Sequence, residues 1–249
     1  MKMISSSRVL TEQADYAIVA LPVVPCKERK FRMCENCGES HKPNIQESLR
    51  EDYAKNGVIL LFGKIEGEKV GFLRHWLMRL ALSYSGSEIK LIIDSPGGSV
   101  LDGFKIFDLI RSLPKKVIGI VNGQCNSMAP VILQACAERI SLPHSTFLLH
   151  NISQETRYSL FDAKARFDSD YKMTREFQEQ IVEILQKRSN LPREKIVELI
   201  TRGDEVHEVQ TVKDALELNL IDRVVEQFEI LPAVKIITQK SSNAVRKKK

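Results

Sequence analysis

Short apolar runs alternate with segments of helical periodicity over most of this chain, from Gly57 to about Val225. The runs that predict strands cover residues 58–62, 89–93, 117–121, 139–142, 146–149 and 220–225. The segments that predict helices cover residues 72–84, 104–113, 130 onwards, 160–187, 190–200 and 212–218. Strands that alternate with helices are typical of βαβ units, whose strands run parallel. The sequence therefore predicts an α/β domain built on a mainly parallel sheet.

The composition changes on either side of this regular region. The first 56 residues hold three of the five cysteines and three of the nine prolines, and they lack a sustained apolar period. The last residues of the chain are polar and basic, which predicts disorder at that end. We therefore expect an N-terminal appendage at 1–56, one folded domain at 57–228 and a tail at 229–249.

The charge and the length of the apolar runs exclude several classes of protein. The formal net charge is +5, and residues 246–249 supply four of these charges, so the remainder is nearly neutral and does not predict nucleic-acid binding. A run such as 58–62 is far shorter than the roughly 20 residues that span a bilayer. The apolar stretch 16–25 follows Glu12 and Asp15 instead of basic residues, which argues against a secretory signal peptide. These features predict a cytoplasmic protein that contacts neither membrane nor nucleic acid.

Three loops that follow predicted strands contain the residues that are suited to catalysis. At 95–99, adjacent glycines let a backbone N–H face an open site. Ser127 stands in a tight turn before a helix, where the following N–H groups favour negative charge. His150 ends a predicted strand and can act as a general base toward a nearby hydroxyl. Each feature taken singly also fits a plain turn, a helix cap or a structural histidine, so the hypothesis rests on their combination.

Together these motifs resemble the proteolytic subunit of the Clp protease. The matching segments, in chain order, are DSPGGSV at 94–100, GQCNSM at 123–128, LPHSTFLLH at 142–150 and ALELNLID at 215–222. The resemblance covers about 57–225. It implies a crotonase-like spiral of strands and helices, with the charged helix 160–187 as a projecting arm through which rings meet.

The resemblance also implies a role for individual residues. Ser127 matches the nucleophile that attacks a peptide carbonyl, and His150 matches the general base. Gly98 and Met128 match the positions whose backbone N–H groups form the oxyanion hole.

The third member of the triad has two candidates. Counting back from Ala215 without a gap puts His207 in the position of the family's aspartate, and Asp204 lies three residues earlier. Asp204 would act through a local insertion, His207 would form a Ser-His-His arrangement, and with neither the site would be weak or inactive. The need for negative charge beside an imidazolium favours Asp204.

The implied function is that of a serine endopeptidase subunit that hydrolyses unfolded proteins through an acyl-enzyme. Such subunits assemble into homo-oligomeric rings, as a heptamer or a tetradecamer, and work with a separate AAA+ ATPase unfoldase. The chain has no P-loop of its own, so ATP would be used by that partner. Two alternatives remain: a non-catalytic subunit of a Clp-type ring, and a crotonase-type acyl-CoA hydratase or isomerase.

A cysteine cluster in the appendage has the spacing of a zinc site. Cys34 and Cys37 form a C-x-x-C pair, and Cys26 and His41 complete a possible tetrahedral set. The second C-x-x-C pair of many zinc sites is missing, so accidental clustering and a redox pair are the competing interpretations. The prediction is a structural zinc ion and no cofactor for catalysis.

Overall fold

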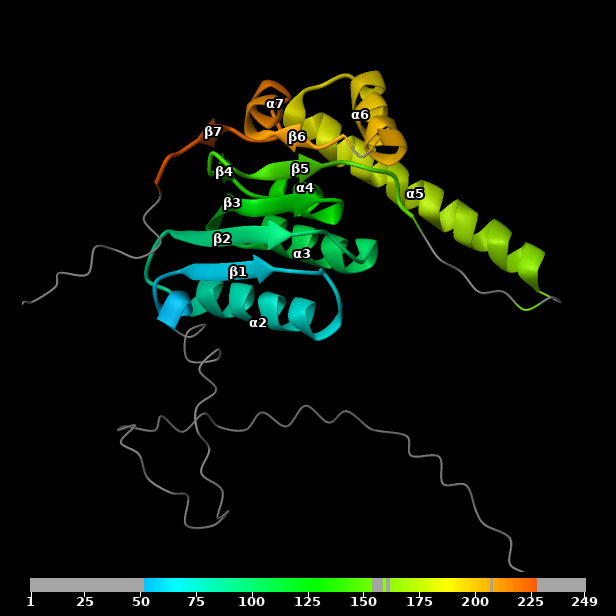
Figure 1. Cartoon of the computed structure of the whole chain (residues 1–249). Coiled ribbons are helices and arrows are strands. Elements are labelled where there is room, and N and C mark those ends of the chain that lie inside the picture. Colours follow the sequence, from blue (N-terminus) through cyan, green and yellow to red (C-terminus); the bar gives the residue numbers. More distant parts are fainter. Residues whose placement is uncertain (1–51, 154–158, 160–161, 207, 228–249) are drawn as a thin grey trace, which may run out of the picture. The chain divides into compact units, whose positions relative to one another are not determined.

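A sheet of seven strands forms the centre of the domain (Figure 1), in a computed structural model that describes residues 52–153, 159, 162–206 and 208–227. The strands are β1 (Val58–Phe62), β2 (Glu88–Ser95), β3 (Lys116–Asn126), β4 (Glu138–Ser141), β5 (Thr146–Leu148), β6 (Gln210–Thr211) and β7 (Arg223–Val224). The helices are α2 (Gly67–Ser83), α3 (Val100–Ser112), α4 (Met128–Leu133), α5 (Ala163–Ser189), α6 (Arg193–Val206) and α7 (Val212–Glu217).

The main path of the sheet runs β1-β2-β3-β4-β7, and every pair along it is parallel. The predicted α/β class is confirmed, because each of the first strands is followed by a helix that returns the chain to the same end of the sheet. One face of the sheet packs against α2 and α3 in the large core, which includes Leu77, Leu91 and Ile106. A smaller cluster is formed by Ile118, Ile120 and Ile140.

β3 is longer than the sequence predicts, and this extension carries the chain to the candidate site. The predicted strand ends at residue 121, whereas β3 continues to Asn126. Its first part pairs with β4, and its last residues, from Gln124, pair with β5. The Gln124 N–H also donates to Asp94 Oδ1 at 2.9 Å. Polar residues continue the strand here because these pairings provide hydrogen-bond partners for the backbone N–H and C=O groups. Hydrophobic periodicity does not reveal such pairings.

Two other details differ from the expectation. The helix expected from Pro130 begins at Met128, so Pro130 lies in its first turn, where proline is tolerated. The sequence does not predict the strand β6, which pairs antiparallel with β5 through Thr146 and Thr211. With two residues, β6 is too short to show a period.

The helix α5 is the projecting arm that the resemblance implies. Figure 1 shows its N-terminal part extending away from the sheet, whereas its C-terminal part packs on the core through Ile181, Val182 and Leu185. The projecting part exposes Phe167 and Tyr171, whose rings stack with centroids 6.3 Å apart. None of the helices in the described ranges is both long and apolar enough to cross a bilayer.

The buried Arg139, together with Gln134 at the end of α4, binds the segment 219–222 near the end of the domain. The backbone N–H and the Nε of Arg139 donate to Asp222 Oδ2 at 2.7 and 3.1 Å, and its Nη1 donates to the Asn219 carbonyl at 2.8 Å. Gln134, at the end of α4, donates through Nε2 to the Leu220 carbonyl at 3.2 Å. Because the guanidinium is buried and paired with a carboxylate, removal of Arg139 would leave that carboxylate without its partner. The C-terminal end of α4, the helix that follows Ser127, is thereby hydrogen-bonded to the segment that contains Leu220.

Candidate active site

One cavity brings together the residues that the sequence singles out. It has a volume of about 730 Å³ and lies where β2, β3 and β5 end. Gly98, Ser127, Met128 and His150 all line it. Apolar side chains form much of the remaining wall, among them Val100, Leu101, Ile152, Met173, Phe177 and Ile181.

Ser127 occupies the junction between β3 and α4 in a backbone conformation that is rare for a residue with a side chain. Its φ is 59° and its ψ is −109°. Such a conformation persists only where the surroundings impose it. Here the Ser127 N–H donates to the Leu148 carbonyl at 2.7 Å, which fixes the serine to the end of β5. His150 follows β5 by two residues, so the same hydrogen bond keeps the two loops adjacent.

Gly98 lies in the turn between β2 and α3, held by the backbone of Ile65. The Ile65 N–H donates to the Gly97 carbonyl, and the Ser99 N–H donates to the Ile65 carbonyl, both at 2.8 Å. Gly98 has a φ of 151°, and a Cβ there would overlap the Ile65 carbonyl oxygen. Only glycine therefore fits between the Ile65 backbone and the cavity.

Two backbone N–H groups are available at the cavity wall. Met128 is the first residue of α4, so its N–H has no acceptor within the helix. Over the described residues, neither the Met128 N–H nor the Gly98 N–H donates a hydrogen bond to another group of the chain. Amides of this kind are suited to an oxygen that becomes negatively charged.

The carboxylate beside His150 belongs to Asp204. The distance between His150 Nδ1 and Asp204 Oδ1 is 3.6 Å, with 25% of the histidine and 38% of the aspartate side chain exposed. Asp204 lies in the last turn of α6. The positional alternative, His207, lies outside the described residues.

Gly203 explains how α6 comes so close to the histidine. A Cβ at Gly203 would overlap the Leu149 carbonyl oxygen and would lie 3.4 Å from the His150 Cβ. The helix therefore packs directly on the backbone before His150, and the next residue along it is Asp204. Sequence reasoning assigns no role to Gly203, because a single glycine within a charged helix gives no signal of such a contact.

Asn151 is a second neighbour of Asp204 that sequence reasoning missed. Both its backbone N–H, at 3.2 Å, and its side-chain Nδ2 donate to Asp204 Oδ2. The two oxygens of the carboxylate thus face different partners, one the imidazole and one Asn151.

Comparison with known proteins identifies the family of the chain. The sequence model of the Clp protease family matches residues 41–228. The chain belongs to the Clp protease family. It is 31% identical, over 76% of its length and 91% of the relative's, to a protein of Rhodococcus jostii named "ATP-dependent Clp protease proteolytic subunit 3". It is 28% identical, over 70% of its length and 82% of the relative's, to the "ATP-dependent Clp protease proteolytic subunit" of Deinococcus radiodurans.

Two cysteines of this Clp protease family member could compete with Ser127 as the nucleophile. Cys125 lies two positions earlier, and Cys136 lies beyond α4; both are buried. Burial raises the pKa of the Cys125 thiol well above its usual value and that of Cys136 to about 12. A thiol that stays protonated is a poor nucleophile, so the hydroxyl of Ser127 is the reactive candidate in this loop.

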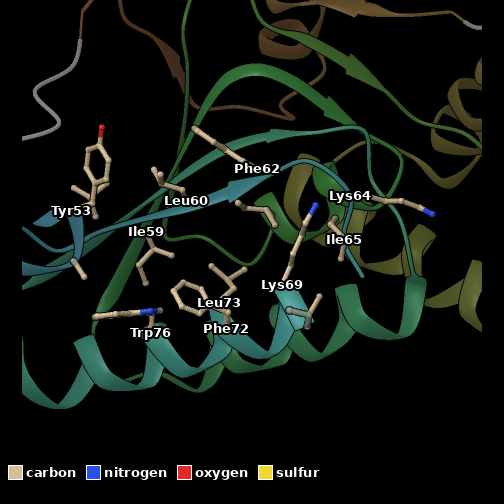
Figure 2. Close-up of a pocket in the computed structure, with 14 residues that line it drawn as sticks. Tyr53, Ile59, Leu60, Phe62, Lys64, Ile65, Lys69, Phe72, Leu73 and Trp76 are labelled. Carbon is tan, nitrogen blue, oxygen red and sulfur yellow. The ribbon is translucent and has the colours of Figure 1, made fainter. Parts of the chain in front are cut away.

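A second cavity is mainly apolar and shares Lys64 with the first. It has a volume of about 170 Å³ between β1 and α2, and Figure 2 shows Ile59, Leu73 and Trp76 in its wall. Among the described residues, its charged side chains are Lys64 and Lys69, and its wall contains no serine, cysteine or histidine. The cavity that holds Ser127 is therefore the candidate active site of this Clp protease family member.

The predicted zinc ligands are not placed by this structure. Cys26, Cys34, Cys37 and His41 lie outside the described residues. Within the described ranges no group of histidine, cysteine and acidic side chains could hold a metal ion.

Proposed function

We propose that the chain is a serine endopeptidase subunit that cleaves unfolded proteins through an acyl-enzyme. The observation that carries the proposal is the cavity that Ser127, His150 and the amides of Gly98 and Met128 line together, with the Asp204 carboxylate 3.6 Å from the imidazole. Hydroxyl, base, orienting carboxylate and oxyanion donors are the parts that peptide hydrolysis by a serine enzyme requires.

In this mechanism Ser127 Oγ attacks the peptide carbonyl while His150 Nε2 accepts its proton. The carbonyl oxygen becomes an oxyanion and accepts hydrogen bonds from the N–H groups of Gly98 and Met128. Each such donor is worth about 3 kcal/mol in the transition state. His150 then gives the proton to the leaving amine, and a water molecule activated by the same imidazole hydrolyses the ester.

Asp204 acts on the histidine and not on the substrate. A carboxylate at Nδ1 keeps the proton on that nitrogen, which leaves Nε2 as the acceptor for the serine proton. Its charge also stabilises the imidazolium that forms. A separation of 3.6 Å is longer than a hydrogen bond, and catalytic contacts of this type commonly shorten when substrate is bound.

The proposal extends to the assembly in which the subunit works. Apolar side chains exposed on a projecting helix are suited to contact another copy, and α5 exposes Phe167, Tyr171 and Met173. We infer a homo-oligomeric ring, heptameric or tetradecameric, in the cytoplasm, to which a separate AAA+ unfoldase delivers protein substrates. The name of the Rhodococcus relative, which includes "ATP-dependent", supports a partner of this kind.

One experiment separates this function from its two rivals. The purified chain is incubated with a fluorophosphonate probe, with a short fluorogenic peptide, and with an acyl-CoA thioester. Labelling of the chain and peptide cleavage without turnover of the thioester are expected. Turnover of the thioester alone would identify a crotonase-type enzyme. A chain that is neither labelled nor active, even with a cognate unfoldase and an unfolded protein, would be a non-catalytic ring subunit.

We also propose a structural zinc ion at Cys26, Cys34, Cys37 and His41. Purification under reducing conditions without chelator is expected to yield about one zinc ion per chain, because four such ligands satisfy tetrahedral zinc. A variant with Cys34→Ser and Cys37→Ser is expected to lose the metal while it keeps the fold of the 57–228 domain. Elemental analysis that finds no transition metal in the parent protein would reject the site.

A further inference from the structure

The Asp204 carboxylate is held asymmetrically, and the residue that holds it is Asn151. Asp204 Oδ2 accepts two hydrogen bonds from Asn151, whereas Oδ1 faces His150 Nδ1. With 38% of its side chain exposed, Asp204 would otherwise exchange these contacts with water and rotate about its last side-chain bond. Two donors on one oxygen fix the plane of the carboxylate and leave the other oxygen directed at the imidazole.

Asn151 is itself held from both sides. It follows His150 in the chain, and the next residue, Ile152, donates its N–H to Gln178 Oε1 of α5 at 3.0 Å. On the other side, α6 packs on the Leu149 carbonyl through Gly203. The side-chain amide of Asn151 therefore links the segment that contains His150 to the helix α6, which contains Asp204.

We propose that Asn151 is a positioning residue of the active site: it orients Asp204, and through Asp204 it selects the Nδ1–H tautomer of His150. This inference rests on the proposed function, but its structural part does not require activity. Asn151 also lines the cavity, so a direct effect on substrate binding is distinguished from an effect through Asp204 by KM and by the tautomer of His150. The tautomer also distinguishes positioning from a general contribution to stability.

The test uses the full chain with Asn151→Asp and Asn151→Ala. The aspartate keeps the shape of the side chain but replaces a donor with a carboxylate that repels Asp204. Both variants are expected to lower kcat on a short peptide by about tenfold or more, with KM changed less than about twofold, as for a charge-assisted hydrogen bond that acts on the chemical step. Asn56→Ala, which removes an exposed amide that binds the Asp52 carbonyl, is the matched control and should keep the parent kcat.

The decisive comparison repeats Asn151→Ala in an Asp204→Asn background. If Asn151 works through Asp204, its effect on kcat should largely disappear there, because interacting residues are not additive. An undiminished loss in that background, or a parent-like kcat in Asn151→Asp, would overturn the proposal.

A spectroscopic readout decides the case even if the parent proves inactive. The chain has five histidines, so selective ¹⁵N-histidine labelling gives a simple spectrum, and His150→Gln assigns the signal. At alkaline pH, where imidazole is neutral, the parent should show His150 protonated at Nδ1, and Asn151→Asp should show a mixture of tautomers. Unchanged tautomers would refute the role of Asn151, whereas an inactive parent with the expected shift would refute only the proposed function.

Discussion

Replacement of Ser127 by alanine is expected to abolish covalent labelling by a fluorophosphonate and to reduce peptide turnover to background. Loss of the nucleophile in a serine protease lowers kcat by roughly six orders of magnitude, because the oxyanion donors alone cannot form an acyl-enzyme. The oligomer should remain intact, since alanine removes only the hydroxyl. Labelling is measured by mass spectrometry of the intact chain, and assembly by light scattering.

Ser112→Ala provides the matched control for the loss of a hydroxyl. Ser112 is exposed at the end of α3, where its Oγ donates to the Leu109 carbonyl at 2.8 Å, far along the helix from the cavity. This variant should be labelled like the parent. If Ser127→Ala is still labelled at a single site, the nucleophile is a different residue and the assignment of Ser127 is wrong.

Asp204→Asn is expected to lower turnover by about four orders of magnitude, the cost of an imidazole held in the wrong tautomer. The amide keeps the size of the carboxylate, but it supplies no charge to the imidazolium and can donate to Nδ1. Turnover of a short peptide at saturating concentration measures the effect on kcat. Phosphonate labelling should slow in parallel, because it depends on the same serine and base.

Two neighbours serve as comparisons for Asp204. Glu205→Gln removes the adjacent exposed charge on α6 and should leave turnover near that of the parent. His207→Ala should also have little effect if Asp204 is the third member. The reverse result, with a large loss in His207→Ala and a small one in Asp204→Asn, would assign the third position to His207. Parent-like activity in both variants would indicate a Ser-His dyad.

Local pattern was sufficient for the longer strands and for the order of the loops, but not for the end of β3 or for β6. The strand predicted at 58–62 has the bounds of β1, because an apolar run between two glycines is a property of the strand itself. Ser127 and His150 are found in the same way, each from its place after a strand. The parallel sheet then brings their loops together at one edge, which is why both line one cavity.

The relation of Asp204 to His150 could not be obtained by counting along the chain. Counting from Ala215 points to residue 207, but α6 continues to Val206 and turns Asp204 toward the histidine. The contacts of Asn151 and Gly203 with their partners span 53 or more positions in sequence and depend on how α6 packs. Such contacts have no period and no motif, so only the folded chain shows them.

The backbone conformation of Ser127 lowers the stability of the fold, whereas its hydroxyl is needed for the proposed reaction. A side chain at a φ of 59° and a ψ of −109° costs about 1–3 kcal/mol relative to an unstrained backbone. Glycine at this position would avoid the cost, and it would also delete the hydroxyl. Any selection of variants for thermal stability alone would therefore favour an inert protein here. Directed evolution of this chain needs an activity screen from the first round, because a residue with a strained backbone is the one that the proposed reaction cannot lose.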